Sequence, residues 1–328
     1  MPHVLVAGRI HEAGLDLLRA TPGVTLECVE EVSTEAYAPL VGRADAILIR
    51  TQPMPAAVIA EAPQLQIVSR HGVGFDAVDV GALNERGIPL AIAGDVNAVS
   101  VAEHTLMLML AVAKRTVRHD AATRDGGWGC RNELAAVELA GRTLLLLGFG
   151  RIGRAVARRA QGFDIRVLAH DPFVDPTAIR AAGAEPAPDL EAALAAADIV
   201  SIHMPLASGA PLLGAAELAR MKPTAIVINT ARGGLIDERA LAEALAAGRL
   251  AGAGLDVLAQ EPPPADQPLL ASERVVLSPH AAGLTQESAA RLSLLAARNI
   301  LDFFAGRLDA KLVVNVDHVS EHARQHLC

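Results

Sequence analysis

Three glycines at the first, third and sixth positions of one hexapeptide can bind phosphate. The hexapeptide is Gly148-Phe149-Gly150-Arg151-Ile152-Gly153, and it follows the apolar run of residues 144–147. Glycines in this pattern let a strand turn sharply into a helix and bring backbone N–H groups against a pyrophosphate, where the helix dipole also favours negative charge. Asp171 lies about 20 residues further on, at a distance where a carboxylate accepts hydrogen bonds from both hydroxyls of an adenosine ribose. The sequence therefore predicts a dinucleotide site.

Arg232 follows a second apolar run and precedes two glycines, Gly233 and Gly234. An arginine just past a strand places its guanidinium over the crevice at the carboxyl ends of the strands. There it can grip a carboxylate with two hydrogen bonds and polarise a neighbouring carbonyl oxygen. Taken alone, a surface arginine in a glycine-rich turn is the more common outcome, so this hypothesis depends on the residues that accompany it.

Two further segments combine a strand end with a reactive side chain. Asp256 leads to Glu261, which stands before the proline run 262–264, and His280 ends a strand and is followed by small residues. The plain alternatives are a turn or cap for Asp256, solvent exposure for Glu261 and a structural histidine at 280. A histidine at a strand end, with a glutamate loop and an arginine turn on neighbouring strands, favours an acid–base site.

Composition limits the class of protein. The chain has 328 residues, of which 52% are hydrophobic and 20% are charged, a length and composition that suit two packed domains. A net charge of −8 without a basic block, and only 2% aromatic residues, argue against a nucleic-acid partner. The longest apolar run, residues 106–113, is far shorter than the roughly 20 residues that span a bilayer, so no membrane partner is expected.

The start of the chain resembles a first strand more than a signal peptide. The three cysteines, Cys28, Cys130 and Cys328, show neither metal-ligand spacing nor a disulfide framework. We therefore expect a cytoplasmic protein without a bound metal, in which Cys28 and Cys130 are packing residues.

Short apolar runs alternate with helix-like segments along the chain, which predicts an α/β protein with parallel sheets covered by helices. The expected strands are residues 4–7, 46–49, 67–69, 90–92, 143–147, 166–169, 199–203, 225–229 and 275–277. Expected helices include residues 189–197 and 238–248, the second capped by Asp237 and ended by Gly248.

The glycine pattern lies in mid-chain, although a nucleotide domain normally begins near its glycine-rich turn. We therefore expect one domain from residues 1–99 plus 284–328 and a dinucleotide-binding domain from residues 100–283. Ser100 and Glu103 form a capping-box pattern that would open a helix running to about Val117 and lead into the second domain. A helix over residues 286–305 would lead back, residues 313–316 would complete the first domain, and residues 321–328 would be frayed.

These motifs, in this order, resemble the D-isomer-specific 2-hydroxyacid dehydrogenases over nearly the whole chain. The resemblance rests on Gly148–Gly153, Asp171, Arg232, Glu261 and His280, together with the segments 101–105, 138–143, 229–233 and 278–280. Branches of this family include 3-phosphoglycerate dehydrogenase, glyoxylate/hydroxypyruvate reductase and D-lactate dehydrogenase. The resemblance implies two Rossmann-like, doubly wound parallel-sheet domains with a cleft between them.

The resemblance also implies a catalytic role for three residues. Arg232 would hold a 2-oxo acid through its carboxylate and carbonyl, and His280 would supply a proton to the carbonyl oxygen. Glu261 would bind the far imidazole nitrogen, fix the ring and favour its charged form. Family members that act on formate carry glutamine at the position of Glu261, so a glutamate favours a hydroxy acid substrate.

By the same resemblance, the cofactor is NAD. Asp256 would face the nicotinamide carboxamide. The rest of the cofactor groove would be lined by His203, Pro205, Thr230, Ala231 and Gly283, in addition to the six residues of the glycine loop. Asp171 is followed by Pro172, Phe173 and Val174, with no arginine or lysine to receive a 2′-phosphate, which favours NAD over NADP.

Residues 69–79 resemble the substrate loop of the family. Backbone N–H groups of Gly72, Val73 and Gly74 would bind the substrate carboxylate, and Arg70 and Arg50 would meet a second anionic group. This favours 3-phosphoglycerate or another doubly anionic acid; glyoxylate or hydroxypyruvate is the alternative. Arg70 could instead pair with Asp76 or Asp79. His71 departs from the small residue expected in the family.

The helix expected over residues 101–117 is apolar almost all round, and its family counterpart packs at a two-fold interface, so a homodimer is expected; interior burial is the alternative. The chain resembles a short form without a C-terminal regulatory domain, so feedback through such a domain is not expected. A different class of function stays open, that of an NAD(H)-sensing scaffold similar to the corepressors of this superfamily, which keep the catalytic residues.

Overall fold

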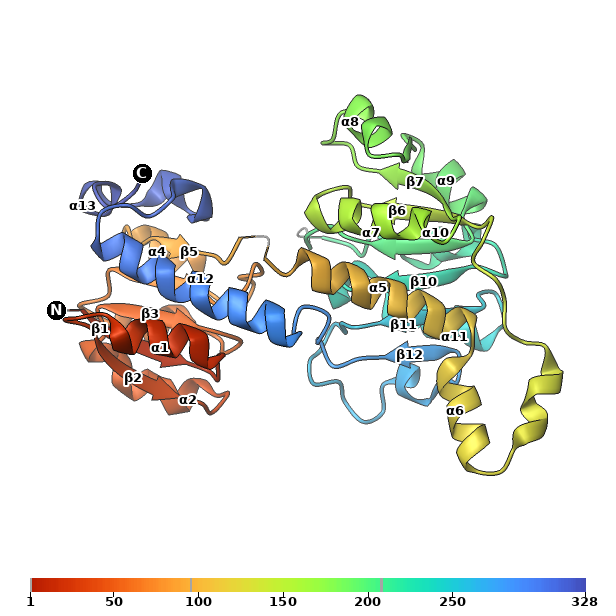
Figure 1. Cartoon of the computed structure of the whole chain (residues 1–328), viewed down its shortest axis with the longest axis horizontal. Helices are drawn as coiled ribbons and strands as arrows, with labels where there is room; N and C mark the ends of the chain where they lie inside the picture. The colour runs from red at the N-terminus through yellow and green to blue at the C-terminus, as the bar shows by residue number, and fades with distance from the viewer. Residues whose placement is uncertain (1, 95, 207–208) are drawn as a thin grey trace. The chain divides into compact units, whose positions relative to one another are not determined.

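The computed structural model describes residues 2–94, 96–206 and 209–328. The chain forms two compact units: residues 1–97 with 285–328, and residues 98–284. Both units are built on a parallel sheet with helices on its faces (Figure 1). Among the described residues, no helix is both long and apolar enough to cross a membrane.

The first unit has a five-stranded sheet in the order β2-β1-β3-β4-β5. Its strands are β1 (His3–Ala7), β2 (Thr25–Val29), β3 (Ala46–Ile49), β4 (Ile67–Arg70) and β5 (Leu90–Ala91). Its helices are α1 (Glu12–Ala20), α2 (Thr34–Tyr37), α3 (Ala56–Ala60), α4 (Val80–Glu85), α12 (Gln286–Phe304) and α13 (Glu321–Arg324), with 3-10 turns η1 (Ala38–Arg43), η5 (Ala310–Leu312) and η6 (Val316–His318).

Alternation along β1 explains why both faces of this sheet are covered. Val4 and Val6 pack in one core cluster with residues of α1 and α12, whereas Leu5 and Ala7 pack in a second cluster with Tyr37 and the following segments. Successive side chains of a strand point to opposite faces, so an uninterrupted apolar strand requires a helical layer on each side.

The second unit has a seven-stranded sheet in the order β12-β11-β10-β9-β6-β7-β8. Its strands are β6 (Thr143–Leu147), β7 (Arg166–His170), β8 (Glu185–Pro186), β9 (Ile199–Ile202), β10 (Ile226–Asn229), β11 (Gly252–Leu255) and β12 (Val275–Leu277). Its helices are α5 (Ala98–Ala113), α6 (Thr116–Arg124), α7 (Arg151–Gln161), α8 (Pro176–Ala181), α9 (Leu190–Ala196), α10 (Ala215–Arg220) and α11 (Glu238–Ala246), with 3-10 turns η2 (Trp128–Glu133), η3 (Gly233–Leu235) and η4 (Pro268–Ala271). The strand order reverses between β6 and β9, which in such folds is where a dinucleotide binds.

The nine predicted strands are present, each within one residue of its expected ends. Asp237 caps α11 by accepting the Ala240 N–H at 3.0 Å, and Gly248, at φ +67°, follows the end of that helix as predicted. Three strands lie outside the prediction: β2, β8 and β11.

Other expectations were wrong. The long helix begins at Ala98, so Ser100 is a buried residue inside it and the capping box does not form. It ends at Ala113, because Arg115 takes a left-handed conformation (φ 53°) and α6 starts a new direction.

The chain terminus is ordered rather than frayed. Ser320 caps α13, and the backbone N–H of Cys328 donates to Leu308 O at 2.8 Å. Cys28 is an exposed residue of the edge strand β2, and Cys130 is only partly buried, so neither is the core residue expected.

Candidate active site

The glycine loop joins β6 to α7 and leaves room for a ligand. Gly148 has φ +97°, and a Cβ there would lie 2.5 Å from His203 O, so the position requires glycine. A Cβ on Gly153 would lie 2.4 Å from Gly148 O. At Gly150, which precedes the first residue of α7, a Cβ would meet nothing within 4 Å. Two glycines thus close the turn and the middle one faces open space, which fits the approach of a pyrophosphate to the helix N-terminus.

Asp171 lies directly after β7 and is bonded to this loop. Its Oδ2 accepts the Phe149 N–H at 2.8 Å, and its Oδ1 accepts the Phe173 N–H at 2.9 Å. The carboxylate is therefore fixed beside the glycine loop, where the sequence predicted ribose recognition. Arg151 and Ile152 begin α7 in the same loop.

His203 follows β9 on the other side of the strand-order reversal. Its Nε2 lies 2.8 Å from Ser201 Oγ, and its backbone N–H donates to Leu147 O at 2.7 Å. Burial lowers the pKa of His203 to about 3, so the ring is neutral at physiological pH. Among the described residues, no carboxylate forms an ion pair with this neutral histidine, so it does not suit acid–base work. Its predicted place in the cofactor groove, next to the exposed Pro205, stays a prediction.

Asn229, the last residue of β10, shapes the turn that carries Arg232. The Asn229 side-chain amide donates to Arg232 O at 2.7 Å, and its Oδ1 accepts the Ala231 N–H at 3.0 Å. The guanidinium of Arg232 donates to Ala231 O at 2.7 Å. Thr230 lies in the same turn, with its hydroxyl 3.0 Å from that of Thr105 on α5.

Gly233 brings this arginine turn against the loop that carries Glu261. A Cβ on Gly233 would lie 2.0 Å from Leu258 C, a separation that no side chain can occupy. The Leu258 N–H in turn donates to Glu261 Oε1 at 3.1 Å. The glycine after Arg232 therefore places two of the three predicted catalytic loops in direct backbone contact.

His280 and Glu261 form a hydrogen-bonded pair. His280 Nδ1 lies 2.6 Å from Glu261 Oε2, and the two side chains are 51% and 38% exposed. A carboxylate accepts at Nδ1, so the other ring nitrogen, Nε2, is the one available to a reacting group. The sequence prediction that these two residues form a pair is matched by this geometry.

Asp256 organises the segment that carries His280. The residue is 2% exposed; Oδ1 accepts from the Ser278 hydroxyl at 2.5 Å and from the Ala281 N–H at 2.9 Å, and Oδ2 accepts the Ala282 N–H at 2.9 Å. The His280 N–H donates to Asp256 O at 2.7 Å. These bonds hold His280 at φ 52°, a left-handed conformation that costs a non-glycine residue about 1 kcal/mol or more.

Sequence reasoning missed two residues that support this arrangement. His104 on α5 places Nε2 2.7 Å from Ser278 Oγ and 3.5 Å from Asp256 Oδ1, so it extends the network under His280. Glu238 accepts from the Ala259 N–H and from the Gln267 amide, and holds the loop before Glu261. Burial raises the pKa of Glu238, and the nearby Glu261 and Asp237 add to this effect. His104 belongs to a segment quoted for the family resemblance, which was the available signal.

The predicted cofactor contact of Asp256 stays a prediction, and so does that of Gly283, which lies just after the Ala281–Ala282 backbone bound by Asp256. The structure shows Asp256 as an acceptor for its own chain. Its buried carboxylate is therefore, first, a positioning group for the histidine segment.

The predicted substrate residues lie at the carboxyl ends of β3 and β4 in the first unit. Arg50 donates to Arg9 O at 2.8 Å, and Arg70 donates to His71 O at 2.7 Å. Gly72, at φ +154°, Val73 and Gly74 follow in an irregular segment. Burial and the neighbouring Arg9 lower the pKa of Arg50. Asp79, weighed as a partner of Arg70, caps α4 by accepting the Ala82 N–H at 3.0 Å.

His71 is buried in this unit and neutral. It is 5% exposed, with Nε2 2.9 Å from Ser293 Oγ on α12. Burial, followed by the charges of Arg50 and Arg70, lowers the pKa of His71 to about 3. The residue that departs from the expected small side chain is thus an interior group that joins the loop to α12.

Comparison with known proteins agrees with these motifs. Residues 106–282 match the family model described as the NAD binding domain of D-isomer specific 2-hydroxyacid dehydrogenases. A D-3-phosphoglycerate dehydrogenase of Archaeoglobus fulgidus is 37% identical over 96% of this chain, which spans only 60% of that relative's length. A glyoxylate reductase of Korarchaeum cryptofilum is 38% identical, over 95% of this chain and 96% of its own length.

Solved structures agree in fold. The crystal structure of the TT0316 protein from Thermus thermophilus has a TM-score of 0.87 and 36% identity, and covers 95% of this chain and 99% of its own. The motifs, the two parallel sheets and these likenesses coincide over the same residues. This chain therefore belongs to the D-isomer specific 2-hydroxyacid dehydrogenase family, with an NAD binding domain in its second unit.

Proposed function

We propose that the protein interconverts a small 2-hydroxy acid and its 2-oxo acid with NAD as the redox partner. The observation that carries this proposal is the His280–Glu261 pair, 2.6 Å apart, in a loop system tied by Gly233 to the turn of Arg232. A cationic group that binds an acid and an imidazole–carboxylate pair that moves a proton are what this reaction needs from a protein.

Each residue has one task in the reduction. Arg232 binds the carboxylate of the 2-oxo acid and polarises its carbonyl oxygen. The glycine loop 148–153 and Asp171 would hold the dinucleotide, which would supply the hydride for the reduction. His280 transfers the proton on Nε2 to the carbonyl oxygen as negative charge develops there, and Glu261 stabilises the charged ring through Nδ1. In the oxidation, His280 takes the hydroxyl proton instead.

The first unit supplies the remaining contacts of the substrate in this proposal. Backbone N–H groups of residues 72–74 bind the carboxylate, and Arg50 and Arg70 meet a second anionic group. The half-buried guanidinium of Arg50 supports this part, because burial makes an added anion more favourable there. We propose a doubly anionic acid such as 3-phosphoglycerate as the leading substrate class, with glyoxylate or hydroxypyruvate second; the relatives include enzymes of both names.

The test is oxidation of NADH, followed by absorbance, with a panel of 2-oxo acids: phosphohydroxypyruvate, oxaloacetate, hydroxypyruvate, glyoxylate and pyruvate, and with NADPH as the cofactor control. Turnover that His280→Asn abolishes would support the reaction. Preference for a doubly anionic acid would support Arg50 and Arg70 as substrate residues, whereas preference for glyoxylate would exclude that role. No turnover with any member of the panel would contradict the proposed function.

We also propose a homodimer. α6 and η2 contain no buried residue, and this segment extends away from the rest of its unit (Figure 1). It exposes large apolar side chains, including Trp128 at 66% and Leu134 at 88%. Apolar surface of this kind marks an association site. Sedimentation of the wild type and of Trp128→Asp would test it, because the variant should dissociate. A cytoplasmic location is part of the same proposal, supported by the three free cysteines.

A further inference from the structure

A cavity of about 430 Å³ lies in the second unit, away from the predicted catalytic residues. Arg274, which lines it, directly precedes β12, while His280 lies beyond the other end of this three-residue strand. Leu245 and Ala246 line it at the end of α11 that leads into β11. The cavity therefore opens at the amino-terminal edge of the parallel sheet, opposite the edge that carries His280, Asp256 and Arg232.

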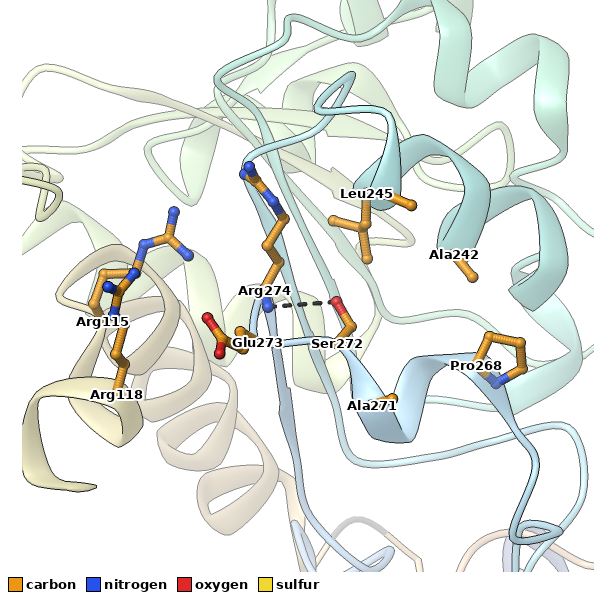
Figure 2. Close-up of a pocket in the computed structure, with 10 residues that line it drawn as sticks. Arg115, Arg118, Ala242, Leu245, Pro268, Ala271, Ser272, Glu273 and Arg274 are labelled. Carbon is orange, nitrogen blue, oxygen red and sulfur yellow. Dashed lines mark hydrogen bonds between the residues drawn. The ribbon is translucent and has the colours of Figure 1, made fainter. Parts of the chain in front are cut away.

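Three guanidinium groups line one side of this cavity (Figure 2). Arg115 and Arg118 come from the turn after α5 and from α6, and Arg274 comes from the segment before β12. Opposing charges are fewer: Glu273 lies in the cavity wall, and Glu133 of η2 pairs with Arg118 at 2.7 Å. Three cations against two carboxylates, one of which is committed to Arg118, leave a positive excess.

Arg115 gives the main evidence that this cavity binds an anion. Its side chain is partly buried, and among the described residues no carboxylate lies within ion-pair distance of its guanidinium. Burial lowers the pKa of Arg115, as do the charges of Arg274 and Arg118, while Glu133 and Glu273 oppose this effect. A cation that loses hydration beside two like charges is destabilised, and a bound anion removes that cost.

The opposite wall is apolar. Ala242, Leu245 and Pro268 face the arginines across the cavity (Figure 2). A volume of about 430 Å³ is within the range of small-molecule sites, roughly 300–1,000 Å³. A wall of guanidinium groups and a wall of methyl and methylene groups together select a ligand with an anionic head and a short apolar body.

We propose that this cavity is a second ligand site, which binds a small organic anion with a phosphate or carboxylate head between Arg115 and Arg274. The ligand is distinct from the substrate, because the cavity lies at the other edge of the sheet from Arg232. The proposal is independent of the substrate and of the reaction assigned to the catalytic edge.

Calorimetric titration of the full-length protein with phenyl phosphate, at constant ionic strength, tests the site. We expect saturable binding that Arg115→Gln and Arg274→Gln each weaken by about tenfold or more, since each removes a charge-assisted hydrogen bond. Arg124→Gln is the matched control, because Arg124 is an exposed arginine of α6 that pairs with Asp120 and does not line the cavity. Titration with inorganic phosphate gives a second Kd. The difference between this Kd and that of phenyl phosphate measures how much the apolar wall contributes to binding.

Three outcomes would overturn the proposal. One is the absence of saturable binding at millimolar concentrations. Another is binding that Arg232→Gln abolishes and Arg115→Gln leaves intact, because the anion would then occupy the catalytic edge. The third is a change of oligomeric state in Arg115→Gln and Arg274→Gln without any effect on titration, which would make the cavity a contact between two copies of the chain.

Discussion

Each unit has a histidine just beyond the carboxyl end of a strand of its parallel sheet. His71 follows β4 and is buried, bonded to a serine hydroxyl and flanked by Arg50 and Arg70. His280 lies beyond β12, half-exposed and bonded to Glu261. Burial and cations keep the first ring neutral, whereas the second ring is open to solvent and bonded to a carboxylate.

The comparison separates position from chemistry. The edge of a parallel sheet collects polar side chains in both units, because the loops there leave buried strands. Among the described residues, His280 has a carboxylate partner and a left-handed backbone, and His71 has neither. The first unit offers arginines and backbone N–H groups instead, which can bind an anion but cannot exchange a proton near neutral pH.

The largest effect should come from breaking the proton-transfer pair. His280→Asn should lower kcat by about 10²- to 10⁴-fold, since the reaction loses its acid–base group. Glu261→Gln should lower kcat by about tenfold to hundredfold, because the amide oxygen still accepts from Nδ1 but carries no charge. Steady-state kinetics measure both. His71→Gln is the control from the other unit, and a loss as large as that of His280→Asn would refute the contrast.

The next effect concerns the support under His280. Asp256→Asn should lower kcat by about tenfold to hundredfold, because an amide cannot accept all three hydrogen bonds that hold residues 278–282. Ser278→Ala, which keeps the backbone bonds, should cost less. Fluorescence titration with NADH separates the alternatives: an unchanged Kd indicates positioning of His280, whereas a strongly raised Kd would indicate the predicted contact with the carboxamide.

A smaller effect tests the anion-binding edge of the first unit. Arg50→Gln should raise KM for a doubly anionic 2-oxo acid by about tenfold, the value of one charge-assisted hydrogen bond, and should leave KM for glyoxylate nearly unchanged. The ratio of the two KM values is the measurement. Equal changes of KM for both substrates would show that Arg50 stabilises its loop and does not bind the second anionic group.

The smallest effect is the pH dependence of stability. The folded pKa of His71, about 3, lies below its ordinary value of 6.5, so below pH 6.5 the unfolded chain binds a proton that the folded chain does not. The stabilisation is complete above pH 6.5 and falls with decreasing pH toward 3. Between pH 6.5 and 5.5, the free energy of unfolding should fall by about 1 kcal/mol from this residue.

Urea unfolding at these two pH values checks this expectation, with His71→Gln as the variant that lacks the titration. The variant should lose less stability than the wild type over this interval. An identical pH dependence would show that His71 is accessible to protons in the folded protein.

Strands and glycine turns were predictable because the residues that determine them are neighbours in the sequence. The apolar run 143–147 and the glycines after it specify β6 and its turn without help from distant residues. β11 was missed because its sequence, Gly252-Ala253-Gly254-Leu255, lacks β-branched residues. Its glycines exist for packing: Cβ atoms on Gly252 and Gly254 would lie 2.7 Å from Val112 and 2.9 Å from Leu108 of α5. Only the helix that covers a strand explains such a sequence.

The catalytic trio was predictable from the motifs, but its support was not. His104 lies more than 170 residues before Ser278, with which it shares a hydrogen bond. No sequence pattern near either residue predicts this contact. The same holds for His71 and Ser293. Burial decides whether such a histidine is a reactive or an interior group, and burial depends on how distant elements pack.

The bonds from Asp171 to the backbone of Phe149 and Phe173 have a kinetic consequence. They order the phosphate-binding turn before any nucleotide arrives, so association need not wait for the loop to fold and little conformational entropy is lost on binding. Cofactor association should then follow a single exponential whose observed rate rises linearly with nucleotide concentration, as for a ligand that enters a rigid receptor.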